Sequence, residues 1–300
     1  MHSDKLILAA PEVRSGSGSS LYRAYRAGEL IRLAEGVFIP ASTWGGLSPD
    51  DRFLTRIHAV AHAFDTQLVF SHLSAAALWR LPMIGSWPDK PEVVVGRGVV
   101  GASRHGYTAR RYEVPPPDEV DGVLVTPLAR TLIDVGRTRP LAVSVAMVDA
   151  GRAVRGIPRA ELHELNRSLA SPRGARRCSD AIALSDAGSG SPGESLSRVT
   201  MHGLGLPAPV LQQEFRDARG LIGYVDFWWP QFRVVGEFDG RGKYVSPDIL
   251  DGRTPAQVVV DEKIREDRLR ALGITVTRWG WDTARSPVAL GRQLAAAGVR

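Results

Sequence analysis

The sequence has one cysteine, Cys178, so it forms no disulfide within the chain and no zinc site built from several cysteines. It lacks any uninterrupted run of about 18 apolar residues, the length that a membrane-spanning helix needs. The apolar stretch at residues 6–10 is too short for the core of a signal peptide. The segment at 96–98 lacks the remainder of any glycine-rich nucleotide-binding motif. These absences predict a cytoplasmic chain with no membrane partner and no structural metal.

Positive charge is in modest excess. The 38 lysine and arginine residues outnumber the 32 aspartate and glutamate residues, for a net charge of +6. Most of this excess falls between Arg152 and Arg177, where there are seven arginines and two glutamates. A solvated linker is one interpretation of this strip, and a surface that contacts DNA phosphates is the other. In the second interpretation, Arg173, Arg176 and Arg177 are candidate DNA-binding residues.

The length of 300 residues is enough for two or three domains. Serine- and glycine-rich segments at 15–20 and 187–191 are typical of flexible connections. We therefore expect a winged helix-turn-helix-like region at 1–45 and a mixed middle domain at 46–177, which ends in the basic strip. A separate C-terminal domain is expected at 186–300.

The first region combines a short basic helix with a tight hairpin. Residues 21–30 have approximately helical spacing of apolar side chains, with Arg23 and Arg26 on the exposed side. Two short strands are predicted within 30–40. This order is typical of a winged helix-turn-helix, in which the helix enters the major groove and the wing touches the DNA backbone. Arg23, Arg26 and, on the first strand, Arg32 are therefore further candidate DNA-binding residues.

The rest of the chain mixes helices with strands, which predicts the α/β class, α+β overall. In the middle region the expected helices are 52–64, 71–81, 127–134 and 141–154, and the expected strands are 92–95, 110–114 and 123–125. In the C-terminal region the expected order is helix 192–202, strand 221–228, strand 232–239, helix 257–272, strand 274–279 and helix 287–297. Those C-terminal elements are expected to form one layered α/β domain around a single sheet.

Two neighbouring strands of the C-terminal region carry three acidic residues. Successive side chains point to opposite faces of a strand, so Glu237 and Asp239 share a face, and Asp226 lies on the preceding strand. If the strands pair as a hairpin, the three carboxylates converge, and their mutual repulsion is costly unless a cation offsets it. Mg²⁺, or Mn²⁺ in its place, prefers such oxygen ligands and can activate water against a phosphodiester. Asp226, Glu237 and Asp239 are thus predicted metal ligands.

The same region resembles the restriction-endonuclease-like fold, and within it the very-short-patch-repair (Vsr) endonucleases. The resemblance depends on Gly193-Glu194-Ser195, Val225-Asp226-Phe227, Glu237-Phe238-Asp239-Gly240, the run 262–269, Leu272-Gly273 and Arg278-Trp279. It implies a metal site in which Glu194 comes from a helix, Asp226 is the first carboxylate and Glu237 is the second. The family pattern ends in lysine where this chain has Asp239, so Lys243 or Lys263 would have to supply the cation.

Several of these residues also have purely structural interpretations. Ser191, Pro192 and Glu194 form the pattern of a helix-capping box, which explains Glu194 without a metal. Glu237 and Asp239 can instead pair with the neighbouring arginines at 233 and 241, and the charges around residue 263 are typical of a solvated helix face. Trp228, Trp229, Trp279 and Trp281 are expected mainly in packing, with base stacking as the alternative. By contrast, no structural role for Asp226 is evident from the sequence.

The first half of the chain resembles the AbiEi-type antitoxins of type IV toxin–antitoxin systems. The residues that carry this resemblance are the segments 27–38 (AGELIRLAEGVF), 71–79 (SHLSAAALW) and 126–134 (TPLARTLID). It implies a DNA-binding winged helix followed by an antitoxin-like middle domain. The serine- and glycine-rich run stands where the family has its first helix, which is a departure from the pattern.

Together these features predict a DNA-binding protein with a metal-dependent endonuclease-like domain that cleaves or nicks DNA. The alternative is a non-catalytic transcriptional regulator or antitoxin that keeps the nuclease fold as a scaffold. Mg²⁺ or Mn²⁺ is the expected cofactor of the first alternative. DNA is the expected partner of both, and a cognate toxin and a second copy of the chain are left open.

Overall fold

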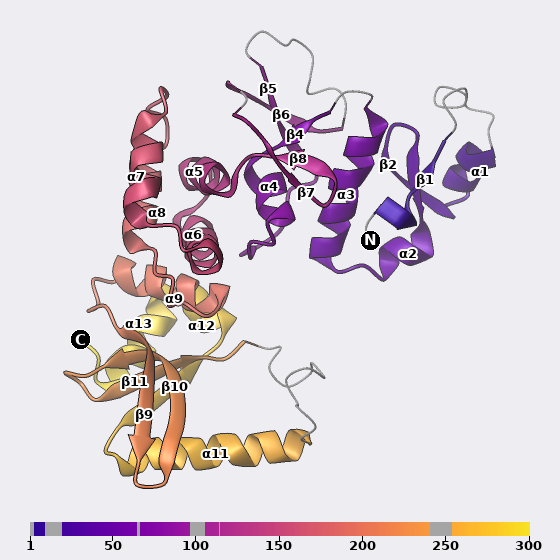
Figure 1. The fold of residues 1–300 in the computed structure, drawn as a ribbon. Coiled ribbons are helices and arrows are strands. Elements are labelled where there is room, and N and C mark those ends of the chain that lie inside the picture. The colour runs from indigo at the N-terminus through magenta and orange to yellow at the C-terminus, as the bar shows by residue number, and fades with distance from the viewer. Residues whose placement is uncertain (1–2, 10–19, 65–66, 97–105, 114, 241–253) are drawn as a thin grey trace. The chain divides into compact units, whose positions relative to one another are not determined.

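The computed structural model describes residues 3–9, 20–64, 67–96, 106–113, 115–240 and 254–300 (Figure 1). Its helices and its mixed sheets confirm the α+β class. The chain divides into two compact units, one formed by residues 1–139 with 157–179 and the other by residues 140–156 with 180–300. The expected domain boundary near residue 45 therefore lies inside the first unit. None of the described helices is both long enough and apolar enough to cross a membrane.

The first unit begins with a small antiparallel sheet. Its elements are the 3₁₀ helix η1 (Ser3–Lys5), β1 (Ile7–Leu8), α1 (Ser20–Arg26), β2 (Leu30–Ala34) and β3 (Val37–Pro40), with strand order β1-β3-β2. The predicted helix and hairpin are thus present, and β1 adds an edge strand that the sequence did not predict. Phe38 is fully buried in this sheet, and Tyr22 and Tyr25 of α1 pack their rings against it.

A second, five-stranded sheet forms the centre of the first unit. The strands are β4 (Val69–Phe70), β5 (Glu92–Val95), β6 (Thr108–Arg111), β7 (Asp118–Val120) and β8 (Val123–Val125), in the order β6-β5-β4-β8-β7. The helices of this unit are α2 (Ala41–Gly45), α3 (Pro49–Ala63), α4 (His72–Leu78), α5 (Leu128–Thr138), α7 (Arg159–Ser168) and the start of α8 (Ala175–Leu184). Side chains of α3, α4 and the sheet form one apolar core together with Ala34 and Val37 of the hairpin. This shared core explains why residues 1–45 do not separate from the residues that follow.

The second unit is a four-stranded sheet with helices. Its elements are α6 (Leu141–Arg155), α9 (Pro192–Gly203), β9 (Val210–Asp217), β10 (Gly220–Trp229), β11 (Val234–Phe238), α11 (Pro255–Ala271), β12 (Thr275–Trp279), α12 (Trp281–Arg285) and α13 (Pro287–Ala297). The strand order is β12-β11-β10-β9, with β11 antiparallel to β10 and parallel to β12. The helix–strand–strand–helix–strand order that the sequence predicts is present. The edge strand β9 was not predicted, because its LQQEFRD segment is polar and none of its side chains is fully buried.

Aromatic packing fills the core of the second unit. Trp229 and Trp279 are buried, and both rings stack with Phe227, with centroid separations of 6.2 and 5.3 Å. Gly193 of α9 lies so close to Phe238 that a Cβ atom there would be 2.0 Å from the Phe238 ring. The structural interpretation of these tryptophans therefore holds, and the glycine before Glu194 is required by the packing of α9 on β11.

Candidate functional site

The sheet of the second unit borders a cavity of about 240 Å³ that brings together the predicted strand carboxylates. Asp226 comes from β10, Glu237 from the end of β11, and Asp239 from the residues just after it. The other lining residues are Tyr224, Phe238, Glu262, Arg265 and Arg278. Three neighbouring strands and α11 thus contribute to one site. Asp226 and Glu237 both line it, as the predicted pairing of their strands requires.

Asp226 has a structural role that the sequence did not suggest. The pairing of β10 with β11 runs from Trp229 to Phe227, opposite Gly236. Just beyond that point Oδ2 of Asp226 accepts a hydrogen bond of 2.7 Å from the backbone N–H of Phe238. The carboxylate therefore satisfies a strand N–H in place of a backbone carbonyl, and this bond fixes its position at the edge of the cavity.

Glu194 lies beside the cavity residues without lining the cavity itself. It is buried at the start of α9, where it accepts hydrogen bonds of 2.8 Å from the N–H of Gly190 and from Oγ of Ser191. Oγ of Ser191 in turn accepts the N–H of Glu194, so Ser191 caps α9 as predicted. The reciprocal half of a capping box is absent, because the Glu194 carboxylate accepts the N–H of Gly190 and not that of Ser191. Burial raises the pKa of Glu194, and the negative charge of Asp226 raises it further.

Gln212 links these two carboxylates and was missed by sequence reasoning. Its Nε2 donates to Oε2 of Glu194 at 3.1 Å and to Oδ1 of Asp226 at 3.4 Å. Its backbone has a φ of 48°, a left-handed conformation that a non-glycine residue rarely adopts. Such strain persists where the surrounding structure requires it, often at functional sites. No signal in the polar β9 segment distinguished Gln212 from its neighbours.

Glu237 is neutralised by two arginines. Its Oε1 lies 2.6 Å from Nη1 of Arg265 on α11, and its Oε2 lies 2.9 Å from Nε of Arg278 on β12. Burial nevertheless raises the pKa of Glu237 above its ordinary value, against the lowering effect of both guanidinium groups. The alternative pairing with Arg233 does not form, since Arg233 donates to the carbonyl oxygen of Gly273, and the arginine at 241 lies outside the described residues.

Neither candidate lysine lies in the described part of the cavity. Lys263 is exposed on α11 and does not line it, and Lys243 lies outside the described residues. Arg265 and Arg278 are the cationic residues there. Both stand within the segments that carry the endonuclease resemblance, so their positions, although not their role, were visible in the sequence.

The wall of the cavity carries more negative than positive charge. Four carboxylates, those of Asp226, Glu237, Asp239 and Glu262, line it together with two guanidinium groups, which leaves a net charge of −2 when all are ionised. Among the described residues, however, no group of three Asp, Glu, His or Cys side chains is arranged to hold a metal ion, so the predicted three-carboxylate set is not assembled. Mg²⁺ at phosphoryl-transfer sites needs only one or two carboxylates, with water and phosphate oxygens completing its shell. In charge and donor type, Asp226 and Glu237 fit such an ion.

The candidate DNA-binding arginines lie at two places in the first unit. Arg23, Arg26 and Arg32 are exposed on α1 and β2, and Nη1 of Arg32 donates to the hydroxyl of Tyr22 at 3.0 Å. Arg173, Arg176 and Arg177 are exposed around the start of α8. Of these three, Arg173 and Arg177 line a second cavity and Arg176 does not.

Comparison with known proteins gives relatives but no family. No protein-family model matches the chain. Two uncharacterized proteins of Mycobacterium tuberculosis, from strains CDC 1551 / Oshkosh and ATCC 25618 / H37Rv, are each 29% identical over 183 residues, which cover 60% of this chain. The chain matches 61% of the length of each of these relatives. The crystal structure of the RV2827C protein from Mycobacterium tuberculosis aligns with 66% of this chain and 76% of its own, at a TM-score of 0.35 and 14% identity, which is too distant to carry an argument.

Proposed function

We propose that this chain binds DNA and hydrolyses its phosphodiester bonds at the cavity of the second unit. The observation that carries the proposal is the meeting of Asp226 and Glu237, from adjacent antiparallel strands, in a cavity with a net charge of −2. A wall of that charge repels a phosphodiester unless a cation enters with it. The endonuclease resemblance gives the same two carboxylates the role of metal ligands.

In this proposal Asp226 and Glu237 would hold a Mg²⁺ or Mn²⁺ ion, which supplies an activated water and neutralises charge on the phosphate. The hydrogen bond from Phe238 keeps one oxygen of Asp226 in place and leaves the other directed toward Gln212. Asp239, which lines the cavity, is available to orient water. Glu194 does not line the cavity and would support this arrangement indirectly, by accepting a hydrogen bond from Gln212.

Arg265 and Arg278 would replace the missing lysine. Both guanidinium groups are occupied by Glu237, and Arg278 also lies 2.8 Å from Glu262. A guanidinium group has five N–H donors, so each arginine can bind a phosphate oxygen while it keeps part of its present pairing. If Glu237 held the ion, the arginine donors that pair with it now would be available to a phosphate oxygen.

The first unit would supply part of the DNA contact. Arg23 and Arg26 are exposed on α1 and Arg32 is exposed on β2, in the helix-then-hairpin order of a winged helix. Contacts of this kind to phosphates position a protein on DNA and weaken with salt.

The test is a plasmid-nicking assay on the full chain with Mg²⁺ or Mn²⁺. Asp226→Asn keeps an acceptor for the N–H of Phe238 but removes the charge, so we expect nicking to fall by about 100-fold or more. Asp226→Ala should do the same. The matched control is Asp267→Asn, an exposed carboxylate on α11 outside the cavity, which should leave nicking unchanged. An absence of nicking by the wild-type chain under either metal, with DNA binding retained, would reject the hydrolysis.

A second candidate function is a non-catalytic DNA-binding regulator or antitoxin. It is favoured by the neutralisation of Glu237 by two arginines and by Asp239 at the position where the family has lysine. Fluorescence anisotropy on labelled duplex DNA tests it. Loss of binding in Arg23→Ala/Arg26→Ala, in a chain that does not nick DNA, would support this candidate over the enzyme.

A further inference from the structure

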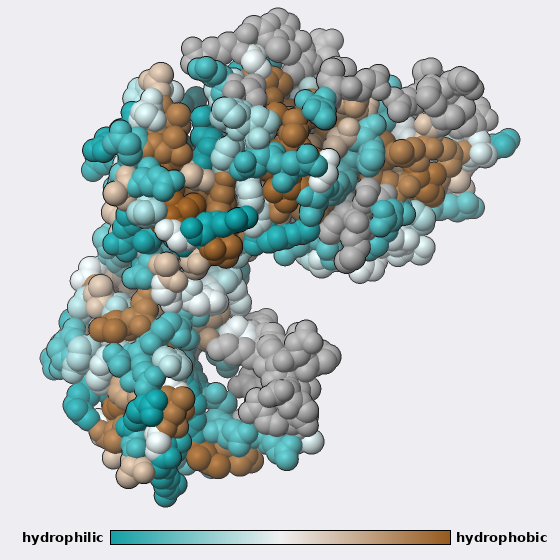
Figure 2. All heavy atoms as spheres, in the orientation of Figure 1, coloured by the Kyte–Doolittle hydropathy of each residue, from teal (hydrophilic) through white to brown (hydrophobic). Residues whose placement is uncertain are grey.

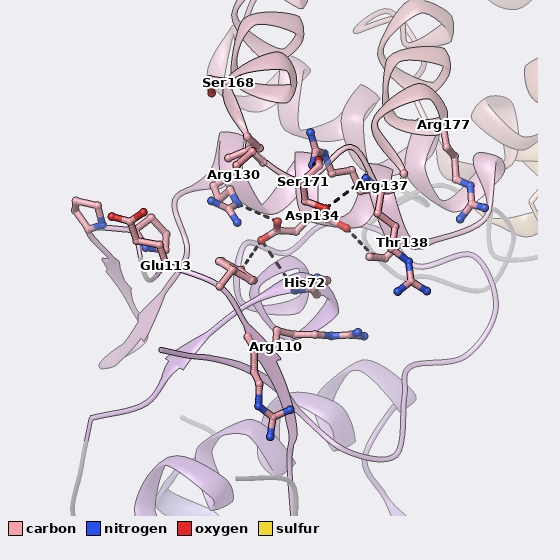
Figure 3. A pocket seen from close by; sticks show the side chains of 18 residues that line it. His72, Arg110, Glu113, Arg130, Asp134, Arg137, Thr138, Ser168, Ser171 and Arg177 are labelled. Atoms are coloured by element: carbon pink, nitrogen blue, oxygen red, sulfur yellow. Dashed lines mark hydrogen bonds and ion pairs between the residues drawn. The ribbon is translucent and has the colours of Figure 1, made fainter. Parts of the chain in front are cut away.

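The first unit contains a cavity of about 840 Å³, which is large enough for a nucleotide-sized ligand. It is bordered by β6 and the residues after it, by α5, and by the segment that joins α7 to α8. Figure 3 shows Arg110, Arg130, Arg137 and Arg177 coming from these different elements around it. Nothing in the proposed nuclease function uses this cavity.

The wall of this cavity is strongly cationic. Its six arginines are Arg110, Arg111, Arg130, Arg137, Arg173 and Arg177. Its carboxylates are those of Glu113 and Asp134, and burial lowers the pKa of His72, the remaining titratable base. The lining residues therefore carry a net charge of +4 at neutral pH, which is compatible with an anionic ligand of several charges.

Two of the arginines are held rigidly. Nε of Arg130 donates to Oδ1 of Asp134 at 2.9 Å, and its guanidinium lies 4.3 Å from the centroid of the Tyr112 ring. Nε of Arg137 donates to Oδ1 of Asn166 at 2.8 Å. Guanidinium groups fixed in this way lose little conformational entropy when they bind a ligand.

Two others are uncompensated. Arg173 and Arg177 are exposed, and within the described residues neither guanidinium group has a hydrogen bond or an ion pair. Gly174 anchors the backbone between them, because a Cβ atom there would lie 2.2 Å from the carbonyl oxygen of Arg137 and its φ is +75°. The chain that carries both arginines is therefore packed directly against α5, at the edge of the cavity.

The floor of the cavity joins two of the segments that resemble the antitoxins. Oδ2 of Asp134, in 126–134, accepts a bond of 2.7 Å from the hydroxyl of Tyr112 and lies 4.0 Å from Nδ1 of His72, in 71–79. His72 has a φ of 51°, a strained conformation for a residue with a side chain. Figure 3 shows Asp134 between Arg130 and Arg137, with His72 near it, so this polar network lies among the cavity residues.

We propose that this cavity binds a small molecule with two or more phosphate groups, of the size of a nucleoside diphosphate or triphosphate. Such a ligand matches the volume and the charge of the cavity, and arginine pairs bind phosphate oxygens in bidentate fashion. A concave site suits a compact ligand better than the backbone of duplex DNA. In the absence of a glycine-rich loop, side chains rather than backbone N–H groups hold the phosphates.

Isothermal titration calorimetry of the full chain with pyrophosphate, ADP and GTP tests the proposal. We expect binding of at least one of the three, weakened about ten-fold or more in Arg173→Ala/Arg177→Ala. Arg176→Ala is the matched control, since this arginine is also exposed on α8 but does not line the cavity. It should change the affinity by less than about two-fold.

A 5′-phosphorylated single-stranded oligonucleotide, titrated in parallel, distinguishes the source of the phosphate. Binding of the oligonucleotide alone would overturn the proposal and assign these arginines to nucleic acid. Absence of binding at millimolar pyrophosphate, ADP and GTP would overturn it too, as would an equal loss in Arg176→Ala. Because the nicking assay depends on Asp226, its failure leaves this result unaffected.

Discussion

Each unit buries a glutamate between two arginines, and the pKa values of the two glutamates shift in opposite directions. In the first unit, Glu92 pairs with Arg110 and Arg139; in the second, Glu237 pairs with Arg265 and Arg278. Burial acts to raise the pKa of both carboxyls, but the net shifts have opposite directions. For Glu92 the nearby cationic groups outweigh burial and hold its pKa below the ordinary value, whereas the pKa of Glu237 stays above it.

The difference arises from the neighbours of each pair. His72, Arg139 and Arg110 all lower the pKa of Glu92, and the hydrogen bond from Arg110 adds to this effect. Glu237 has a further carboxylate nearby, Glu262, whose charge opposes ionisation. An identical motif of one glutamate and two arginines therefore sits in a cationic environment in one unit and in an anionic one in the other. The two proposals differ accordingly: an anionic ligand for the first unit and a cation for the second.

The largest expected effect comes from replacing, in each unit, a glycine beside the site that has no room for a Cβ atom. Gly174→Ala would force a methyl group onto the Arg137 carbonyl, and Gly193→Ala would force one onto the Phe238 ring, at 2.2 and 2.0 Å. We expect each substitution to lower the free energy of unfolding by about 3 kcal/mol, measured by urea denaturation.

Gly203→Ala is the control for this pair. It lies at the end of α9, and a Cβ atom there would have no heavy atom within 4 Å. Its stability should stay the same or rise slightly, because alanine favours helix. Equal destabilisation by all three substitutions would show that the close approaches are not what the two sites require.

The pH dependence of stability should differ in sign between the two glutamates. The pKa of Glu92 is lowered on folding, so its contribution is full above its ordinary value of 4.5 and is lost as the pH falls through the folded value. The pKa of Glu237 is raised, so its contribution is full below 4.5 and is lost as the pH rises through the folded value. Urea unfolding of wild type, Glu92→Gln and Glu237→Gln covers both changes when the series runs from about pH 2 to pH 8.

Asp149 is another buried carboxylate of the second unit with a raised pKa. It is buried on α6, where Oδ2 accepts bonds from Ser195 at 2.7 Å and Arg198 at 2.8 Å. Burial raises its pKa from 3.8 to about 6, so the chain should lose about 3 kcal/mol from this group as the pH rises from 4 to above 6. Asp149→Asn should flatten that slope. A slope that Asp149→Asn leaves unchanged would contradict the assignment.

Ligands of opposite charge should stabilise the two units separately. Pyrophosphate at 100 times its Kd should stabilise the first unit by about 2.7 kcal/mol, and Mn²⁺, which lacks a phosphate co-ligand in this assay, should stabilise the second by less. Hydrogen exchange resolves the two, through the amides of α5 for pyrophosphate and those of β11 for Mn²⁺. At the same pyrophosphate concentration, Arg173→Ala/Arg177→Ala should reduce only the first effect, to about half for a ten-fold weaker affinity, and Asp226→Asn should reduce only the second. Protection of both units by either ligand would contradict the assignment of the anion to the first unit and the cation to the second.

Much of the second unit was predictable, because alternating apolar residues fix the strands and capping residues fix the helix starts. Asp226 and Glu237 were found because carboxylates stand out in apolar strands. Gln212 was not found, since a polar residue in a polar strand gives no local signal, and the segment with Arg278 gave its position without its pairing with Glu237. Their role depends on strand order, which brings β9 and β12 to opposite edges of one sheet.

The arginine cavity of the first unit was harder to predict. The basic strip was visible, but charge along the sequence does not tell which side chains share a concave surface. Arg173 and Arg177 line the cavity while Arg176 does not, although all three looked equivalent in sequence. The sequence likewise does not tell which apolar side chains are buried. Val260 and Ile264 on α11 are 55% and 50% exposed, and Figure 2 shows hydrophobic surface over this helix.

The smallest expected effect concerns Cys178, which follows the cavity residue Arg177. Its thiol is fully buried against Gly136, and burial raises its pKa to about 12. Only a local opening of α8 exposes the thiolate, so its reaction with a thiol reagent at pH 8 measures that opening. Pyrophosphate, by binding across α5 and α8, should slow the labelling several-fold, whereas Mn²⁺ should leave it unchanged. Labelling that is fast in the native chain, or slowed equally by both ligands, would show that the opening of α8 is not coupled to the cationic cavity.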